Sequence, residues 1–145
     1  GAFVFIPFMS LTELPAQLVT ILTSLPIGEI GILLIVVLIY MFLGMFLEAM
    51  AMLVLTIPVV IPIAVALDWD LIWFGIIVVI VLEMGMISPP VGINVFIVKS
   101  IAQDVPMSTI FNGIWPFWFA MAAMIGLLIV FPQIASYLPQ AIVGG

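Results

Sequence analysis

The chain has 145 residues, of which 68% are hydrophobic and only 6% are charged, and its seven acids and single lysine give a formal charge of −6. Average soluble domains draw about 25% of their residues from the charged types, so this composition excludes a water-covered surface and predicts an integral membrane protein. The lack of a basic patch argues against nucleic-acid binding, and the lack of Cys and His argues against thiol or zinc chemistry and against a conventional enzyme.

Two segments are expected to precede the main membrane helices. Residues 1–9 are almost entirely apolar and carry no initiator Met, which indicates the end of a membrane helix that begins earlier in a longer polypeptide. Residues 10–26 are half polar, with Ser10 or Thr12 as candidate N-caps and Pro15 suited to a first helical turn. Their apolar spacing favours a helix lying at the membrane surface, with an ordinary connecting helix as the alternative.

A nearly continuous apolar stretch, residues 27–70, is interrupted at Gly44 to Glu48. Its first arm, Ile30 to Leu43, amounts to about 21 Å of helix, which is short for a hydrocarbon core of ~30 Å. Two full spans would just fit the stretch. A turn at Gly44 to Glu48 fits the polarity better, because the chain would then return to the side it came from. We therefore predict a re-entrant helical hairpin, whose tip must be buried in protein or line a cavity.

Residues 71–104 are too long for one untilted span and too short for two spans with a loop. Pro89 and Pro90 lie near the centre of this segment. Proline lacks an N–H group, clashes with the preceding turn and pushes the residue before it out of the helical region. The sequence therefore predicts a discontinuous transmembrane helix that breaks at Ser88 and restarts near Val91.

Residues 105–145 are expected to form the last transmembrane helix and a tail. Ser108 and Thr109 are the candidate N-caps of this helix, and Pro132 is expected to end it. The residues from Pro139 onward are expected to form a loose tail. The predicted fold is thus all-α and membrane-embedded.

The predicted break is the strongest candidate for a binding site in the sequence. A half-helix ending near Ser88 presents free carbonyls with partial negative charge, and one beginning near Val91 presents free N–H groups with partial positive charge. Broken helices of transporters bind cations and anions in this way. Ser88 adds a hydroxyl, Gly92 permits close backbone approach, and Asn94 adds an amide. The alternative is a proline kink that only bends the helix.

Two acids, Glu48 and Glu83, lie at apparent membrane depth and are candidate functional residues, because burying an acid in lipid is costly. The structural alternatives are an N-cap for Glu48 and a hydrogen bond or subunit contact for Glu83. Lys99 is expected to reach a membrane interface. By the positive-inside rule it would be cytoplasmic, which would place the base of the hairpin and the C-terminus in the periplasm.

Several runs resemble the large membrane subunit of the tripartite ATP-independent periplasmic (TRAP) transporters. They are, in chain order, Leu43-Gly44-Met45-Phe46-Leu47-Glu48, Pro58 and Pro62, Trp73-Phe74-Gly75, Leu82-Glu83-Met84-Gly85-Met86-Ile87-Ser88-Pro89-Pro90-Val91-Gly92-Ile93-Asn94, Phe131-Pro132-Gln133 and Tyr137-Leu138-Pro139. The resemblance covers essentially the whole chain, as the C-terminal third of that subunit. The family usually has Thr at the position of Ser88 and often Asp at the position of Glu48.

The resemblance implies a sodium-coupled importer of organic acids, such as C4-dicarboxylates or sialic acid, in the bacterial inner membrane. It also implies an elevator built from inverted repeats, a small membrane subunit and a periplasmic binding protein as partners, and no cofactor beyond the coupling ion. The family's second sodium site maps onto Gly44, Ser88, Pro89 and Gly92. Val91, Gly92 and Asn94, at the positive start of the second half-helix, are expected from helix polarity to face the anionic substrate.

Two other functions remain open from the sequence. The first is another sodium- or proton-coupled carboxylate carrier of the same architecture, such as a divalent anion/sodium symporter. The second is a membrane anchor or assembly subunit that does not transport, which would need no Ser-Pro-Pro-Val-Gly break. An intramembrane hydrolase is disfavoured, because the chain has no His, Cys or paired-Asp motif.

Overall fold

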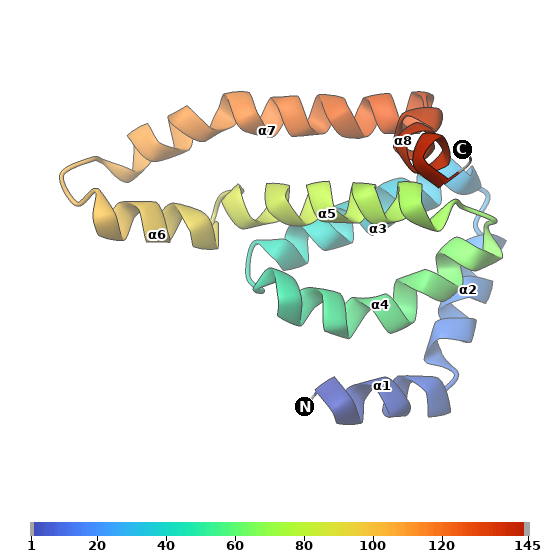
Figure 1. Cartoon of the computed structure of the whole chain (residues 1–145). Coiled ribbons are helices and arrows are strands. Elements are labelled where there is room, and N and C mark those ends of the chain that lie inside the picture. The colour runs from blue at the N-terminus through green and yellow to red at the C-terminus, as the bar shows by residue number, and fades with distance from the viewer. Residues whose placement is uncertain (1, 144–145) are drawn as a thin grey trace.

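The computed structural model describes residues 2–143, and within them the chain forms eight helices and no strand (Figure 1). The helices are α1 Ala2–Leu11, α2 Leu14–Ser24, α3 Gly28–Gly44, α4 Ala49–Ala66, α5 Leu71–Ile87, α6 Ile93–Ile101, α7 Met107–Val130 and α8 Gln133–Val143. The all-helical fold predicted from composition is confirmed for this part of the chain.

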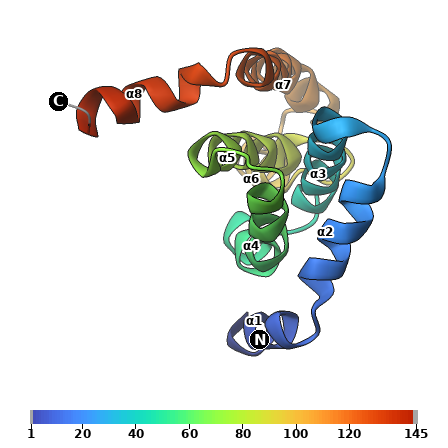
Figure 2. The ribbon, with the colours of Figure 1, turned by 90° about the vertical axis from the view of Figure 1, so that its right-hand side faces the viewer.

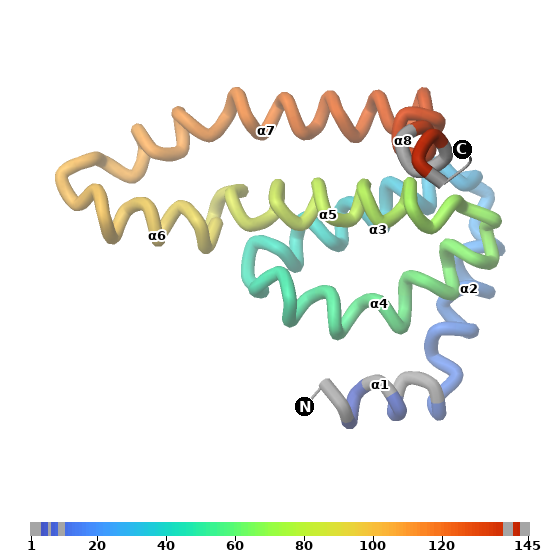
Figure 3. Tube along the Cα trace, viewed as in Figure 1, coloured from blue at the N-terminus to red at the C-terminus, as the bar shows by residue number. Residues whose placement is uncertain are grey.

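The longer helices run in roughly the same direction, so the molecule has two distinct ends (Figure 1). α7 runs along α5 and α6, which follow one another, while α3 and α4 form a hairpin whose turn lies beside the α5–α6 junction (Figure 1). We call the opposite end of the hairpin, where α3 begins and α4 ends, the base. At the base, α2 and α8 run across the direction of α5 and α7, as the view along the bundle shows (Figure 2). The loop from α6 to α7 lies at the far end (Figure 3).

The core lies where α3 packs on α5, and α7 covers the other side of α5. Leu33 and Tyr40 of α3 and Ile77 and Val81 of α5 are almost fully buried. Lipid is as apolar as these side chains, so close packing and interhelical hydrogen bonds hold such helices together. Two hydrogen bonds between helices serve this role. Tyr40 donates to Thr56 Oγ1 across the hairpin at 2.5 Å, and Trp73 Nε1 of α5 donates to the Leu128 carbonyl of α7 at 2.6 Å.

Two of the described helices, α4 and α7, are long and apolar enough to cross a membrane. The first hairpin arm is longer than the sequence indicated, because α3 has 17 residues, or about 26 Å at 1.5 Å per residue. The length of the hairpin helices is therefore no longer an argument for a re-entrant hairpin. The position of the hairpin turn beside the α5–α6 junction is the better argument, since that junction lies between the two ends of the molecule.

Several predicted helix ends differ from those observed. α1 continues through Ser10, and the N-cap of α2 is Glu13, in the left-handed region with φ 53° and without a side-chain cap. Pro15 does lie in the first turn of α2, as predicted. At α7 the N-cap is Pro106, so Ser108 and Thr109 fall inside the helix and the predicted caps are wrong.

The predicted loose tail is also wrong for the described residues, since α8 continues through Val143, while positions 144–145 lie outside them. Ile134, Tyr137 and Ile142 recur at helical spacing, and the prediction of a loose tail did not take this pattern into account. α7 ends at Val130, just before the Pro132 that was expected to end it.

Candidate functional site

The interruption predicted at the double proline is present. α5 ends at Ile87 with Ser88 as its C-cap, and α6 begins at Ile93. The restart is two residues later than predicted, because Gly92 is the N-cap of α6 and takes a left-handed conformation with φ 56°. A Cβ added at Gly92 would lie 3.1 Å from the Ser88 carbonyl oxygen and also 3.1 Å from a methyl of Val95. Backbone angle and space therefore both require glycine at this position.

The end of α5 presents carbonyl oxygens without hydrogen-bond donors. The Gly85 carbonyl accepts from Ser88 N–H at 3.0 Å, and the Met84 carbonyl accepts from Ser88 Oγ. Pro89 and Pro90 have no N–H to offer, and no other described residue donates to the carbonyls of Met86 and Ile87. These two oxygens, at the negative end of a 17-residue helix, are suited to a cation.

The start of α6 has the opposite polarity. The Gly92 carbonyl accepts from Val95 N–H at 2.8 Å and from Phe96 N–H at 3.3 Å, which closes the first turn. The N–H groups of Ile93 and Asn94 donate to no other described residue. Asn94 is partly exposed beside them, and Val91 is likewise partly exposed. This end is suited to an anion.

Ser88 is buried, with 3% of its surface exposed. Its hydroxyl donates to the Met84 carbonyl at 2.6 Å and accepts from the indole N–H of Trp118 at 2.9 Å. Trp118 lies 30 positions further along the chain, on α7. Sequence reasoning did not identify this partner, because no local pattern links the two residues.

Gly44, the last residue of α3, lies against Gly85 of α5. A Cβ added at Gly44 would lie 3.1 Å from Gly85 Cα, and a Cβ added at Gly85 would lie 2.9 Å from both Gly44 Cα and the Met41 carbonyl oxygen. The glycine pair thus brings the hairpin turn against the last turn of α5, three residues before Ser88. Gly85 is a second residue of the site that sequence reasoning missed, although its type and its position before the break were visible.

The two candidate acids, Glu48 and Glu83, do not join this site. Glu48 is exposed and acts as the N-cap of α4, where its two carboxylate oxygens accept from the N–H groups of Met50 at 3.0 Å and Ala51 at 3.1 Å. Glu83 is exposed on α5 and makes no hydrogen bond or ion pair with another described residue. The described part of the chain contains no group of three or more acids that could hold a metal ion.

Lys99 lies in the last turn of α6, at the far end of the molecule. Its ammonium donates to the carbonyls of Gln103 at 2.6 Å and Val105 at 2.8 Å. The lysine therefore stabilises the α6–α7 loop and the negative end of α6, some distance from the break.

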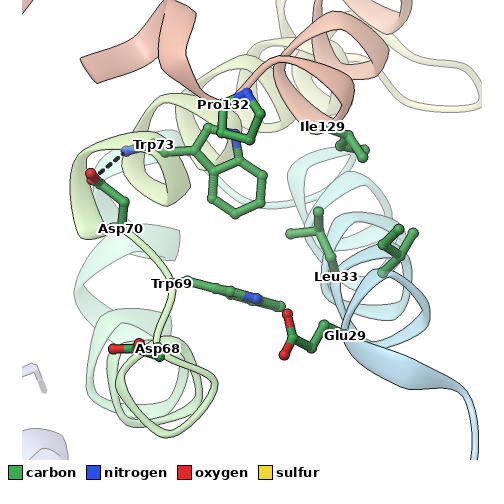
Figure 4. A pocket seen from close by; sticks show the side chains of 9 residues that line it. Glu29, Leu33, Asp68, Trp69, Asp70, Trp73, Ile129 and Pro132 are labelled. Atoms are coloured by element: carbon green, nitrogen blue, oxygen red, sulfur yellow. Dashed lines mark hydrogen bonds between the residues drawn. The ribbon is translucent and has the colours of Figure 1, made fainter. Parts of the chain in front are cut away.

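A cavity of about 270 Å³ lies at the base of the hairpin, remote from the break (Figure 4). Trp69 and Trp73 form its walls, Glu29 lies at its rim, and the Asp68 carboxylate points away from it. Asp70 is occupied as the N-cap of α5, accepting from Ile72 N–H at 2.8 Å. Tryptophans and acids at one end of apolar helices are typical of a membrane–water boundary.

A model of the family described as tripartite ATP-independent periplasmic transporter, DctM component, matches residues 1–134. The chain belongs to this family. A sialic acid TRAP transporter permease protein of Haemophilus influenzae is 30% identical over 74 residues, which are 51% of this chain and 12% of the relative. The large permease protein of a sialic acid TRAP transporter of Vibrio cholerae is 30% identical over 75 residues, or 52% of this chain and 17% of the relative.

The large permease protein of a C4-dicarboxylate TRAP transporter, from Rhodobacter capsulatus, is 32% identical over 71 residues, or 49% of this chain and 16% of the relative. The chain thus matches less than a fifth of the length of these three relatives. No solved structure matches the chain. Membership of the DctM family agrees with the resemblance seen in the sequence and favours the tripartite carrier over the other carboxylate carriers.

Proposed function

We propose that this chain is part of the large membrane subunit of a sodium-coupled importer of organic acids, located in the bacterial inner membrane and spanning it several times. Its partners would be a small membrane subunit and a periplasmic binding protein. Its transported anion would be a carboxylate of the kind named for its relatives, a sialic acid or a C4-dicarboxylate. The role is transport and not enzymatic catalysis.

One observation carries the proposal. At the α5–α6 break, the carbonyls of Met86 and Ile87 and the N–H groups of Ile93 and Asn94 lack partners among the described residues. Free carbonyls at one half-helix end and free N–H groups at the next can hold a sodium ion and a carboxylate side by side. Coupling then follows from electrostatics, because the bound cation lowers the cost of placing the anion in a site of low dielectric constant.

Sodium would be held by the Met86 and Ile87 carbonyls, by the Ser88 hydroxyl and by the hairpin turn that starts at Gly44. Gly44 contributes through the close approach to Gly85, which brings the turn to the break. The carboxylate of the substrate would meet the start of α6, from Val91 and Gly92 to Asn94. Pro89 contributes by withholding an N–H group from the carbonyls before it.

We further propose that α3 and α4 enter and leave the membrane on the same side, as a re-entrant hairpin. Its turn lies beside the break and not at the level of the α6–α7 loop, which supports this topology. The hairpin and the broken helix would form the second-repeat half of an elevator-type transport domain. The matched length, 12% to 17% of the three relatives, leaves room for a first repeat elsewhere in the full subunit.

The test is uptake by the complete transporter in proteoliposomes, with a labelled sialic acid and a labelled C4-dicarboxylate as alternative substrates. We expect uptake of one of them under an inward sodium gradient and little uptake when potassium replaces sodium. Ser88→Ala should raise the sodium concentration for half-maximal uptake, by about fivefold if one ligand contact is lost, while Ser88→Thr should be nearly silent. Equal uptake without sodium would refute sodium coupling.

A further inference from the structure

The indole of Trp118 joins α7 to the break through a single hydrogen bond. Its N–H group donates to Ser88 Oγ at 2.9 Å. The ring is held by two edge contacts with its neighbours on α7, at centroid distances of 5.8 Å to Trp115 and 5.5 Å to Phe119. These contacts favour the ring orientation in which the indole N–H points to Ser88.

The hydrogen bonds of Ser88 leave little choice in how its hydroxyl points. A hydroxyl has one proton and two lone pairs, and indole is only a donor. The proton goes to the Met84 carbonyl at 2.6 Å and one lone pair accepts from Trp118, so a single lone pair remains. Without Trp118, the oxygen would lose the partner that holds this orientation from outside α5.

We infer that Trp118 is a positioning residue that orients the Ser88 hydroxyl, so that its remaining lone pair can bind the sodium ion at the α5–α6 break. This inference rests on the proposed function. Trp118 itself does not touch the ion, because its N–H is a donor and would repel a cation. It acts by fixing the oxygen of Ser88 and by tying the end of α5 to the long helix α7.

The experiment measures sodium binding without a transport substrate. The complete transporter, purified in detergent, is melted at increasing NaCl with KCl making up constant ionic strength, and the rise in melting temperature gives an apparent sodium Kd. Four variants are compared with the parent: Ser88→Ala, Trp118→Phe, their double variant, and Trp73→Phe. The last is the matched control, since it also removes an indole hydrogen bond, donated to the Leu128 carbonyl, but far from the break.

We expect Trp118→Phe to weaken sodium binding about fivefold, the order of one lost hydrogen bond, and the double variant to bind no more weakly than Ser88→Ala. Trp73→Phe should lower the melting temperature without changing the sodium Kd. If Ser88→Ala raises the sodium Kd but Trp118→Phe keeps the parental value, the positioning role of Trp118 is refuted and the role of Ser88 stands. The positioning role is also refuted if the two effects on the sodium Kd simply add in the double variant. A parental Kd in Ser88→Ala would overturn the proposed role of Ser88, and the inference with it.

Discussion

At the scale of single residues, glycine decides how closely the hairpin can approach α5. The pair Gly44 and Gly85 lets two helix backbones touch, as small residues do in membrane helix packing. Any side chain at either position would meet backbone atoms, which cannot rotate away. The position of the hairpin turn relative to the break therefore depends on these two residues.

We predict that Gly85→Ala destabilises the subunit by about 1–3 kcal/mol, the usual cost of overpacking. The new methyl would lie 2.9 Å from Gly44 Cα and from the Met41 carbonyl oxygen. The matched control is Gly75→Ala on the same helix, where a Cβ would meet nothing within 4 Å. Melting temperatures of the purified transporter measure the effect, and equal values for the two variants would contradict it.

At the scale of elements, one side chain determines where the second hairpin arm begins. Glu48 has extended backbone angles and accepts from the first free N–H groups of α4, which is the geometry of an N-cap. The acid at the hairpin turn is thus explained by local structure. A sodium ligand is not needed to account for it.

We predict that Glu48→Ala loosens the start of α4, by about 1 kcal/mol, while Glu48→Asp keeps the cap and is nearly silent. Hydrogen exchange of the Met50 and Ala51 amides should become faster in the alanine variant only, since Glu48 accepts from both. The apparent sodium Kd should stay at the parental value. A rise in that Kd as large as in Ser88→Ala would show that Glu48 is a ligand after all.

The elements differ in how well the sequence predicts them. The break at Ser88 follows from the covalent structure of Pro89 and Pro90, and the hairpin turn follows from Gly44 and Glu48, so both could be located locally. The predicted cap at Ser108 was wrong because Pro106, two residues earlier, was the competing start. The Trp118–Ser88 hydrogen bond depends on how α7 crosses α5, which no local pattern encodes.

At the scale of the whole molecule, the two ends differ in chemistry. The base holds Glu29, Asp68, Asp70 and two tryptophans, together with the crossing helices α2 and α8. The far end holds Lys99 and the α6–α7 loop. Between them α7 runs for 24 residues, or about 36 Å, which is enough to cross a hydrocarbon core of ~30 Å. The ends therefore fit opposite faces of one membrane.

This layout predicts the outcome of cysteine labelling, for which the chain offers a background without native cysteine. In the complete transporter with its other cysteines removed, Asp68→Cys should react with an impermeant maleimide added from the periplasm. Gln103→Cys, in the α6–α7 loop, should react only from the cytoplasm, since the positive-inside rule predicts that Lys99 lies on that side. The informative variant is Phe46→Cys at the hairpin turn, whose side chain is 51% exposed in this chain. A re-entrant hairpin should leave this cysteine labelled from the cytoplasm much more slowly than Gln103→Cys, since its turn stops at the level of the break. Labelling of Phe46→Cys from the cytoplasm as fast as Gln103→Cys would show instead that α3 and α4 both cross the membrane completely.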